Sequence, residues 1–275
     1  MTDAAFYGKL ADLHSHTRLC GHAEGEPRDL ARRAKDLGLG VLGISEHCPM
    51  PSGFDRLRLA EERLPDYLAM VEDARRAFPT LPIRLGIEAE YCRGEAESVR
   101  RFLEKADWDH VIGSVHYLGK WNFDDPKEIP AWKALSDLRA AWQAYFDLWK
   151  EAARTRLYDT LGHPDLVKKF GFVPEGSCEA MFEDALRAVA EAGCCIEINT
   201  AGLRKPVKEI YPSAAFLKIA RRMEIPITFG SDAHAPSEVG ANFREAVALA
   251  RACGYTESAR FEKRKRTMWP LPEEE

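Results

Sequence analysis

Short apolar runs recur seven times along the chain, and each run ends in polar residues that can carry chemistry. The seven stretches are LADLHSH, VLGISEH, IRLGIEAE, HVIGSVH, DTLGHPD, CIEINT and ITFGSDAH. Continuous apolar runs of this length are typical of strands that are buried on both faces. The pattern therefore predicts seven buried strands.

Segments with helical periodicity lie between most of these runs, and many begin at a proline or end at a glycine. In residues 27–38, for example, Leu30, Ala34 and Leu37 share one face. Further helices are expected over residues 65–78, 98–106, 130–156, 177–193 and 212–223. The aromatic residues of 130–156 recur at spacings of three and four, which indicates core packing. The charged segments FEKRKR and PLPEEE at the C-terminus predict a solvated tail.

Alternation of strands and helices predicts βα units around a parallel sheet. Seven units favour a (β/α)7 barrel, closed or distorted, with a doubly wound open sheet as the alternative. The 275 residues suit one domain spanning 1–275. In either architecture the functional residues gather at the C-terminal ends of the strands.

Polar residues that end the seven runs should therefore converge. They are His14, His16, Glu46, His47, Glu88, His116, His163, Asn199, Asp232 and His234. His22 lies in the loop after the first strand. His110 begins its run, so we expect it at the opposite end of the barrel in a structural role.

Two pairs of these residues have the spacing of metal ligands. His14 and His16 point to one side of a strand, as do Asp232 and His234. The first and last strands of a barrel are neighbours, so the pairs would face each other. Imidazole and carboxylate together are the ligands of hydrolytic Zn, Mn or Fe centres. Seven histidines and two carboxylates suit two or three ions, which favours phosphoester hydrolysis.

Composition excludes several other classes of protein. The net charge of -5 and the pI of about 6.0 provide no basic field for nucleic acid. No apolar stretch has the length of a membrane span, and no signal peptide is apparent, so a cytoplasmic protein is expected. The seven cysteines, two of them adjacent at Cys194 and Cys195, indicate reduced thiols rather than disulfides.

At the level of whole segments, the sequence resembles the polymerase and histidinol phosphatase (PHP) family over residues 12–240. The segments that carry the resemblance are DLHSHTRLCGHAEG, GISEHCPMP, LGIEAEY, VIGSVHYLG, LGHPDLVKKFG, EINTAGLRK and ITFGSDAH. HTRLCGHAEG, NTAGLRK and WNFDD further resemble the monofunctional histidinol-phosphate phosphatases of that family. The resemblance implies a distorted seven-stranded βα barrel with three divalent ions, which are Zn, Fe or Mn.

The ligand pattern of the family carries over residue by residue. It implies His14, His16, Glu88 and Asp232 at a first metal; Glu88, His116 and His163 at a second; and His22, His47 and His234 at a third. Glu88 would bridge two ions. Asp232 and His234 are also the candidates for protonating the leaving group. Cys20 has no place in this ligand set.

A phosphate dianion also attracts fixed cations, and arginine suits it through bidentate contact. Arg204 is the first candidate for binding substrate, followed by Lys205, Lys168 and Arg18. Glu46 and Asp12 are expected to orient imidazole ligands. Trp121 and Phe123 would either line the substrate site or pack in the interior, and packing is favoured.

The resemblance implies hydrolysis of the small phosphate monoester L-histidinol phosphate to L-histidinol and phosphate, in histidine biosynthesis. One alternative keeps the metal site but changes the substrate to a nucleotide, a phosphotyrosine protein or a nucleic-acid end. A metal-dependent amidohydrolase and a non-catalytic, metal-stabilised module are further alternatives. The sequence predicts no oligomeric state.

Overall fold

Seven parallel strands form one sheet in the order of the sequence, in a computed structural model that describes residues 2–50 and 53–273. The strands are β1 (Ala11–Asp12), β2 (Val41–His47), β3 (Ile83–Glu90), β4 (His110–Ser114), β5 (Thr160–Leu161), β6 (Cys195–Asn199) and β7 (Ile227–Gly230). Each of the seven predicted runs contributes one strand. The predicted number of strands and their parallel direction are confirmed.

The first and last strands meet, which closes the sheet. The backbone N–H of Leu13 donates to the carbonyl of Phe229 at 3.0 Å, and the N–H of His16 donates to the carbonyl of Ala233 at 2.8 Å. A doubly wound open sheet would leave these two edges apart. The fold is therefore the distorted βα barrel that the sequence favours.

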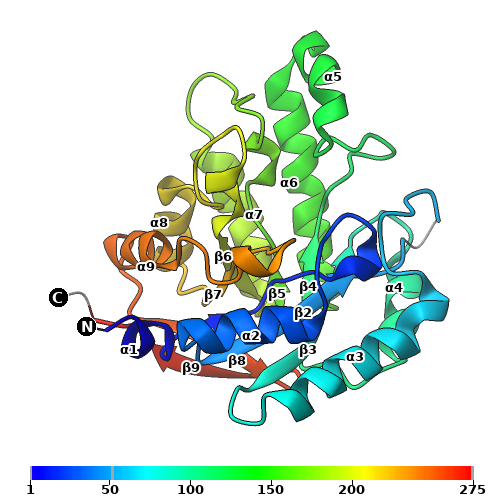
Figure 1. The fold of residues 1–275 in the computed structure, drawn as a ribbon. Helices are drawn as coiled ribbons and strands as arrows, with labels where there is room; N and C mark the ends of the chain where they lie inside the picture. The colour runs from blue at the N-terminus through cyan, green and yellow to red at the C-terminus, as the bar shows by residue number, and fades with distance from the viewer. Residues whose placement is uncertain (1, 51–52, 274–275) are drawn as a thin grey trace.

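Helices precede, connect and follow the seven strands along the chain, and most of them pack around the outside of the barrel (Figure 1). They are α1 (Asp3–Tyr7), α2 (Pro27–Leu37), α3 (Leu64–Ala77), α4 (Ala96–Leu103), α5 (Ile129–Ala134), α6 (Leu138–Thr155), α7 (Glu179–Ala192), α8 (Ala214–Arg222) and α9 (Phe243–Ala252). Helix α2 shows why the boundaries were predictable: Pro27 occupies its first turn, and Gly38 ends it with a φ of 73°.

The prediction of a single helix over residues 130–156 is wrong, because two helices, α5 and α6, occupy this range. The chain leaves the helical conformation at Leu135, and Asp137 starts α6 by accepting a hydrogen bond from the N–H of Ala140 at 2.9 Å. The periodicity continues across the break because both helices pack against the core. Trp142, Tyr145 and Trp149 of α6 are buried, which confirms packing as their role.

The predicted tail is solvated but not irregular, because residues 257–270 form an antiparallel hairpin of β8 (Glu257–Glu262) and β9 (Lys265–Pro270), in which all residues of β9 are exposed. The last two residues of the predicted tail, 274–275, lie outside the described residues. Ala259 and Phe261 of β8 pack with Leu13 and Cys195 at the N-terminal end of the barrel. Arg264 forms an ion pair with Asp159, just before β5, at 2.5 Å. The run of basic residues hides the strands in the sequence, because the burial of Ala259 and Phe261 and the ion pair of Arg264 depend on distant residues.

His110 lies inside the barrel, at the end away from the other strand-end histidines, as predicted. Its Nε2 donates to the carbonyl of Leu13 at 2.7 Å. Gly43 and Gly86 leave room for the ring: a Cβ at Gly86 would lie 2.2 Å from Cε1 of His110. Burial lowers the pKa of His110 to about 4, so the ring is neutral near pH 7.

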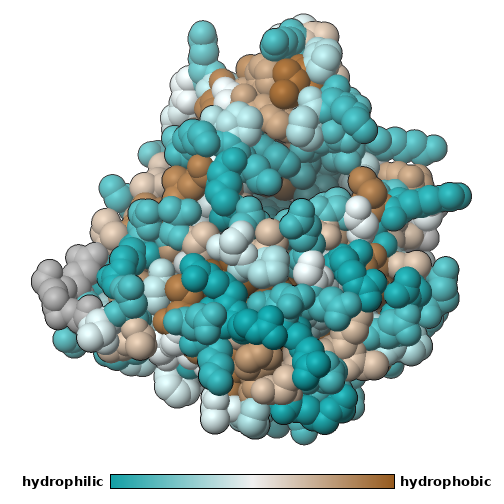
Figure 2. All heavy atoms as spheres, viewed as in Figure 1, coloured by the Kyte–Doolittle hydropathy of each residue, from teal (hydrophilic) through white to brown (hydrophobic). Residues whose placement is uncertain are grey.

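On the face shown in Figure 2, hydrophilic side chains predominate and hydrophobic residues form small separate groups. Among the described residues, no helix has the length and apolar character needed to cross a membrane.

Candidate metal centre

Glu88, at the end of β3, lies at the centre of the converging strand-end residues. Its Oε1 is 3.0 Å from Nε2 of His163 and 3.7 Å from Nε2 of His116. Its Oε2 is 2.7 Å from Nδ1 of His47 and 3.5 Å from Nε2 of His14. The two oxygens therefore face different sets of imidazoles, which is the arrangement of a carboxylate that bridges two ions.

Three groups of side chains bring their ligand atoms within 4.8 Å of one another. The groups are His14, His16 and Glu88; Glu88, His116 and His163; and His16, His47 and His234. Asp232 joins the first group, with Oδ1 3.3 Å from Nε2 of His16. His22 joins the third, with Nε2 3.1 Å from Nε2 of His234. His16 thus lies between two groups, whereas the resemblance places it in the first alone.

The chemistry of these side chains fits divalent metal ions. Nε2 of His14, Nε2 of His16, Nδ1 of His47 and Oε2 of Glu88 are buried, and none makes a well-directed hydrogen bond in the described part of the chain, although the last two atoms lie 2.7 Å apart. Buried polar atoms without partners are rare because losing their hydration costs free energy. Cations held between them would satisfy all four atoms at once. Nitrogen and carboxylate oxygen are the appropriate donors for such ions.

Electrostatics favours the ligand forms of four of these groups, whereas the neighbouring carboxylates outweigh burial and raise the pKa values of His14, His16 and His116, whose extra protons a cation would replace. Burial opposes ionisation of Glu88, but the imidazoles of His14, His47 and His116 outweigh it and hold the pKa of this carboxyl well below its usual range. Burial and the neighbouring His16 lower the pKa values of His22 and His47, and that of His234 to about 3. Glu88 is therefore an anion and these three imidazoles are neutral, so all four can bind a cation.

Two predicted ligands have backbone conformations that most residues avoid. Asp232 has a φ of 51° and His163 a φ of 27°. Left-handed conformations of non-glycine residues cost free energy and concentrate at functional sites. Arg204 holds the backbone at Asp232 by donating from Nη2 to the carbonyls of Ser231 at 2.7 Å and Asp232 at 3.3 Å.

Glu197 was missed in the sequence and lies directly behind the cluster. Its Oε1 is 2.7 Å from Nδ1 of His14, and its Oε2 accepts the backbone N–H of His163 at 2.9 Å. Glu197 and Asn199 are two residues apart on β6, so they point to the same face. In CIEINT this alternation predicts Glu197 at the site as readily as Asn199.

Glu90 was missed for the same reason, two residues after Glu88 on β3. Its Oε2 is 2.7 Å from Nδ1 of His116, and its Oε1 accepts the backbone N–H of that residue at 2.7 Å. Arg58, also missed, donates to Glu90 from Nη2 at 2.9 Å. These contacts fix the ring of His116 in one orientation.

The two carboxylates that were expected to orient imidazoles differ in position. Glu46 lies beside a predicted ligand, with Oε1 3.7 Å from Nδ1 of His16. Asp12 instead accepts hydrogen bonds from the N–H and hydroxyl of Ser231 and from the N–H of Gly240. Asp12 therefore fixes the backbone after β7, and its side chain contacts no imidazole among the described residues.

A cleft of about 490 Å³ opens over the cluster. Its lining includes candidate ligands from both sides of Glu88, such as His47, His116 and Asp232. Other lining residues come from the loops around the cluster and were not predicted to bind substrate, namely Asp55, Arg58, Tyr117, Asp124, Asp125 and Lys169. The cleft gives a small molecule access to the candidate metal ligands.

Of the four cations predicted to bind substrate, Lys205 lines this cleft. Lys168 is buried and forms ion pairs with Asp165 and Glu209, each at 3.0 Å. Arg18 is half exposed and pairs with Glu26 at 2.7 Å.

Arg204 pairs through Nε with Glu238 at 3.0 Å. Its Nη1 is buried without a hydrogen-bond partner among the described residues. Trp121 and Phe123 pack around Trp132, which confirms packing as the favoured role for both.

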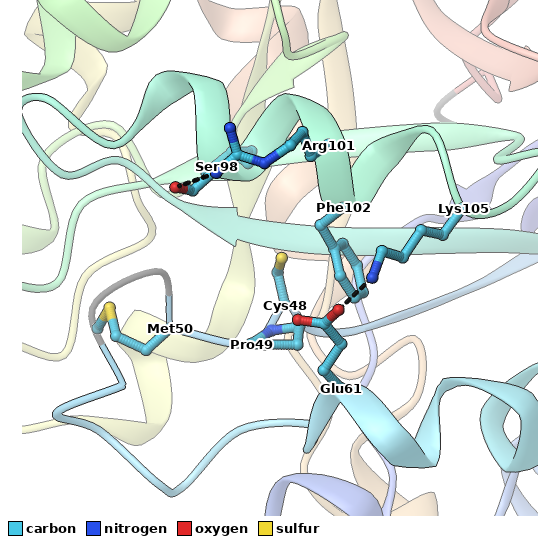
Figure 3. A pocket seen from close by; sticks show the side chains of 9 residues that line it. Cys48, Pro49, Met50, Glu61, Ser98, Arg101, Phe102 and Lys105 are labelled. Carbon is cyan, nitrogen blue, oxygen red and sulfur yellow. Dashed lines mark hydrogen bonds and ion pairs between the residues drawn. The ribbon is translucent and has the colours of Figure 1, made fainter.

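A second pocket, of about 290 Å³, lies beside Cys48, the residue after His47 (Figure 3). Glu61 and Lys105 point toward each other across it and form an ion pair. Burial raises the pKa of the Cys48 thiol well above its usual range, so the sulfur is protonated. The residues that line this pocket include none of the predicted ligands.

Comparison with known proteins gives consistent matches. The PHP domain profile matches residues 12–201, and a PHP-associated profile matches residues 216–243. A protein of Deinococcus radiodurans named "Probable histidinol-phosphatase" is 43% identical over 247 residues, which cover 89% of this chain and 94% of that protein. The histidinol-phosphatase of Bacillus subtilis is 28% identical and matches over 83% of this chain and 95% of its own.

Among solved structures, one of histidinol phosphate phosphatase from Lactococcus lactis, in complex with Zn, L-histidinol and phosphate, has a TM-score of 0.81 at 24% identity. The match covers 94% of this chain and 99% of that one. A HisK structure from Listeria monocytogenes has a TM-score of 0.78 at 26% identity and covers 86% of this chain and 99% of that one. With its seven-stranded barrel, its cluster of histidines and carboxylates and these matches, the chain belongs to the PHP family.

Proposed function

We propose that this protein is a metal-dependent phosphomonoesterase that hydrolyses L-histidinol phosphate to L-histidinol and phosphate. The observation that carries the proposal is the buried position of Glu88 between two sets of imidazoles, among which His47, His116 and His163 line an open cleft. The relative that is 43% identical and is named as a histidinol-phosphatase supports the choice of substrate.

Divalent ions bound here would lower the pKa of a water molecule and neutralise charge on the phosphoryl oxygens. The protein holds the groups that bind them. Glu88 offers an oxygen to each side of the cluster, and Asp232 faces the pair His14 and His16. Glu197 and Glu90 keep the rings of His14 and His116 in one tautomer and one orientation.

Three ions are proposed, since nine side chains from the strand ends and the first loop gather in three overlapping groups. The proposed set is His14, His16, His22, His47, Glu88, His116, His163, Asp232 and His234. Their identity is Zn, Fe or Mn, and each accepts imidazole and carboxylate ligands. Residues 1–275 are proposed to act as one metallophosphatase domain.

Asp232 and His234 are better suited to holding a cation than to donating a proton. Burial raises the pKa of the Asp232 carboxyl, but His14, His16 and His234 outweigh it and hold that pKa well below its usual range. The pKa of His234 is lowered to about 3. Both groups are therefore deprotonated near pH 7, which supports their assignment as ligands.

The proposal is tested by phosphate release from a panel of monoesters combined with elemental analysis of the purified protein. The panel contains L-histidinol phosphate, nucleotides, phosphotyrosine and p-nitrophenyl phosphate. We expect kcat/KM to be far higher for L-histidinol phosphate than for the others. Comparable values across the panel would overturn the substrate assignment and leave a general phosphoesterase.

Removal of metal separates an enzyme from a metal-stabilised accessory module. A chelator should abolish phosphate release, and Zn, Mn or Fe added in excess over the chelator should restore it. An accessory module would lose thermal stability and have no phosphatase activity to restore.

A further inference from the structure

The proposed metal ions would bind only the phosphate end of the proposed substrate. Near pH 7, L-histidinol phosphate carries an ammonium group close to its phosphate. A cation that leaves water for a cleft needs a carboxylate or a comparable acceptor to compensate for lost hydration. A carboxylate in the cleft that is occupied neither by metal nor by another side chain is the best acceptor for this ammonium group.

Three carboxylates outside the proposed ligand set line the cleft: Asp55, Asp124 and Asp125. Asp55 is paired with Nε of Arg58 at 2.8 Å and accepts the N–H of Leu57 at 2.9 Å. Asp124 is paired with Nζ of Lys169 at 2.5 Å. Two of the three carboxylates are therefore already neutralised by fixed cations.

Asp125 differs from both. One oxygen, Oδ1, accepts the backbone N–H of Lys127 at 2.8 Å and so caps the short turn Pro126–Glu128. The carboxylate has no ion pair in residues 2–50 and 53–273, and its second oxygen has no hydrogen-bond donor there. Asp125 thus keeps its charge and one oxygen available to a ligand.

The neighbouring contacts hold Asp125 in place. Lys169 donates both to the carboxylate of Asp124 and to its backbone carbonyl, the latter at 2.8 Å. Asp124 and Asp125 line the same cleft as the candidate ligands His116 and His163. The segment is thereby fixed at the wall of the cleft beside the metal cluster.

We propose that Asp125 determines specificity by binding the ammonium group of the substrate. This inference rests on the proposed function, because it assumes a phosphate monoester that carries an amine. Asp125 is not a metal ligand in this assignment, and it takes no part in the chemical step. Its contribution is selective binding of a cationic alcohol phosphate over neutral ones.

The variant Asp125→Asn tests the proposal because asparagine keeps an oxygen that can cap the turn and removes only the charge. Three substrates should be compared: L-histidinol phosphate, the analogue 3-(imidazol-4-yl)propyl phosphate, which lacks the amine, and p-nitrophenyl phosphate. We expect kcat/KM for L-histidinol phosphate to fall about 10- to 100-fold, as for loss of a charged hydrogen bond. The values for the two substrates without the amine should stay within about twofold, which is below the effect of one neutral hydrogen bond.

Glu128→Gln is the matched control, since it removes a charge from the same turn outside the cleft lining and should leave all three values unchanged. Equal losses on all three substrates would show that Asp125 acts on the loop, and an unchanged value for L-histidinol phosphate would exclude the contact. Either result overturns the inference while the proposed function stands. Wild-type protein that does not prefer L-histidinol phosphate would overturn both.

Discussion

Glu197 and His14 form a buried pair in which Oε1 of the carboxylate lies 2.7 Å from Nδ1 of the ring, while Nε2 of the same ring faces Glu88 at 3.5 Å. The carboxylate fixes the tautomer that leaves Nε2 free for a cation. Glu197 also holds the backbone of His163, so one side chain orients candidate ligands on both sides of Glu88.

Replacing Glu197 with glutamine should therefore weaken metal binding without removing any ligand. We expect a loss of about 10- to 100-fold in metal affinity, the usual effect of removing such a carboxylate. Competition with a chromogenic chelator measures it directly. Glu191→Gln, at an exposed position on α7, is the control and should leave the affinity unchanged.

Arg58 compensates two buried or partly buried carboxylates, Asp55 and Glu90. Arg58→Met should lower the free energy of unfolding by about 3–5 kcal/mol, because it leaves Glu90 buried without its cation. Urea denaturation measures this change. Arg63→Met breaks the exposed pair with Asp66 and should cost less than about 1 kcal/mol. Similar losses in the two variants would contradict the compensating role of Arg58.

Arg204 is predicted to bind the phosphoryl group; it lies outside the residues that line the cleft, and its Nη1 is buried without a hydrogen-bond partner among the described residues. Arg204→Ala should raise KM for phosphate monoesters about tenfold, as for loss of one charged hydrogen bond, and should leave metal content unchanged. Steady-state kinetics and elemental analysis on the same preparation check both parts. Arg222→Ala, at an exposed pair with Glu183, serves as the control. A fall in metal content would show that Arg204 acts by holding the backbone of Asp232.

His110 should make stability depend on pH. Its pKa is about 4 in the folded barrel and 6.5 in the unfolded chain, so acid favours unfolding. The contribution of the neutral ring is complete above pH 6.5 and declines as the pH falls toward 4.

Between pH 7 and 5 the loss should be about 2 kcal/mol. His110→Gln keeps a donor for the carbonyl of Leu13 and should remove this part of the pH dependence. Urea denaturation of both proteins at pH 7 and 5 with a chelator present measures the difference, and equal slopes would rule out His110 as the cause.

The barrel and the convergence of its histidines were predictable because each buried run ends in polar residues. Imidazoles at these positions, such as His47 and His116, do not contribute to an apolar core and therefore indicate a functional site. The topology of parallel strands then brings those ends together. What the pattern could not supply was which ring nitrogen faces the cluster, since this depends on Glu197 and Glu90, two carboxylates inside strands.

The hairpin of β8 and β9 escaped prediction for a different reason. Its turn is held by the ion pair of Arg264 with Asp159, and β8 is held by burial of Phe261; both contacts involve residues distant in sequence. In the same way, the break between α5 and α6 is set by a local cap at Asp137 rather than by the apolar pattern, which runs on through it.

The same hairpin has a consequence for turnover. It packs against the N-terminal end of the barrel, and the cleft over the candidate ligands lies at the opposite end, so the ester and both products would share that cleft. Phosphate held by ions at His14, His16, Glu88 and Asp232 would block the site for the next ester. Inorganic phosphate should consequently act as a competitive inhibitor, so the rate of hydrolysis should fall as the phosphate concentration rises.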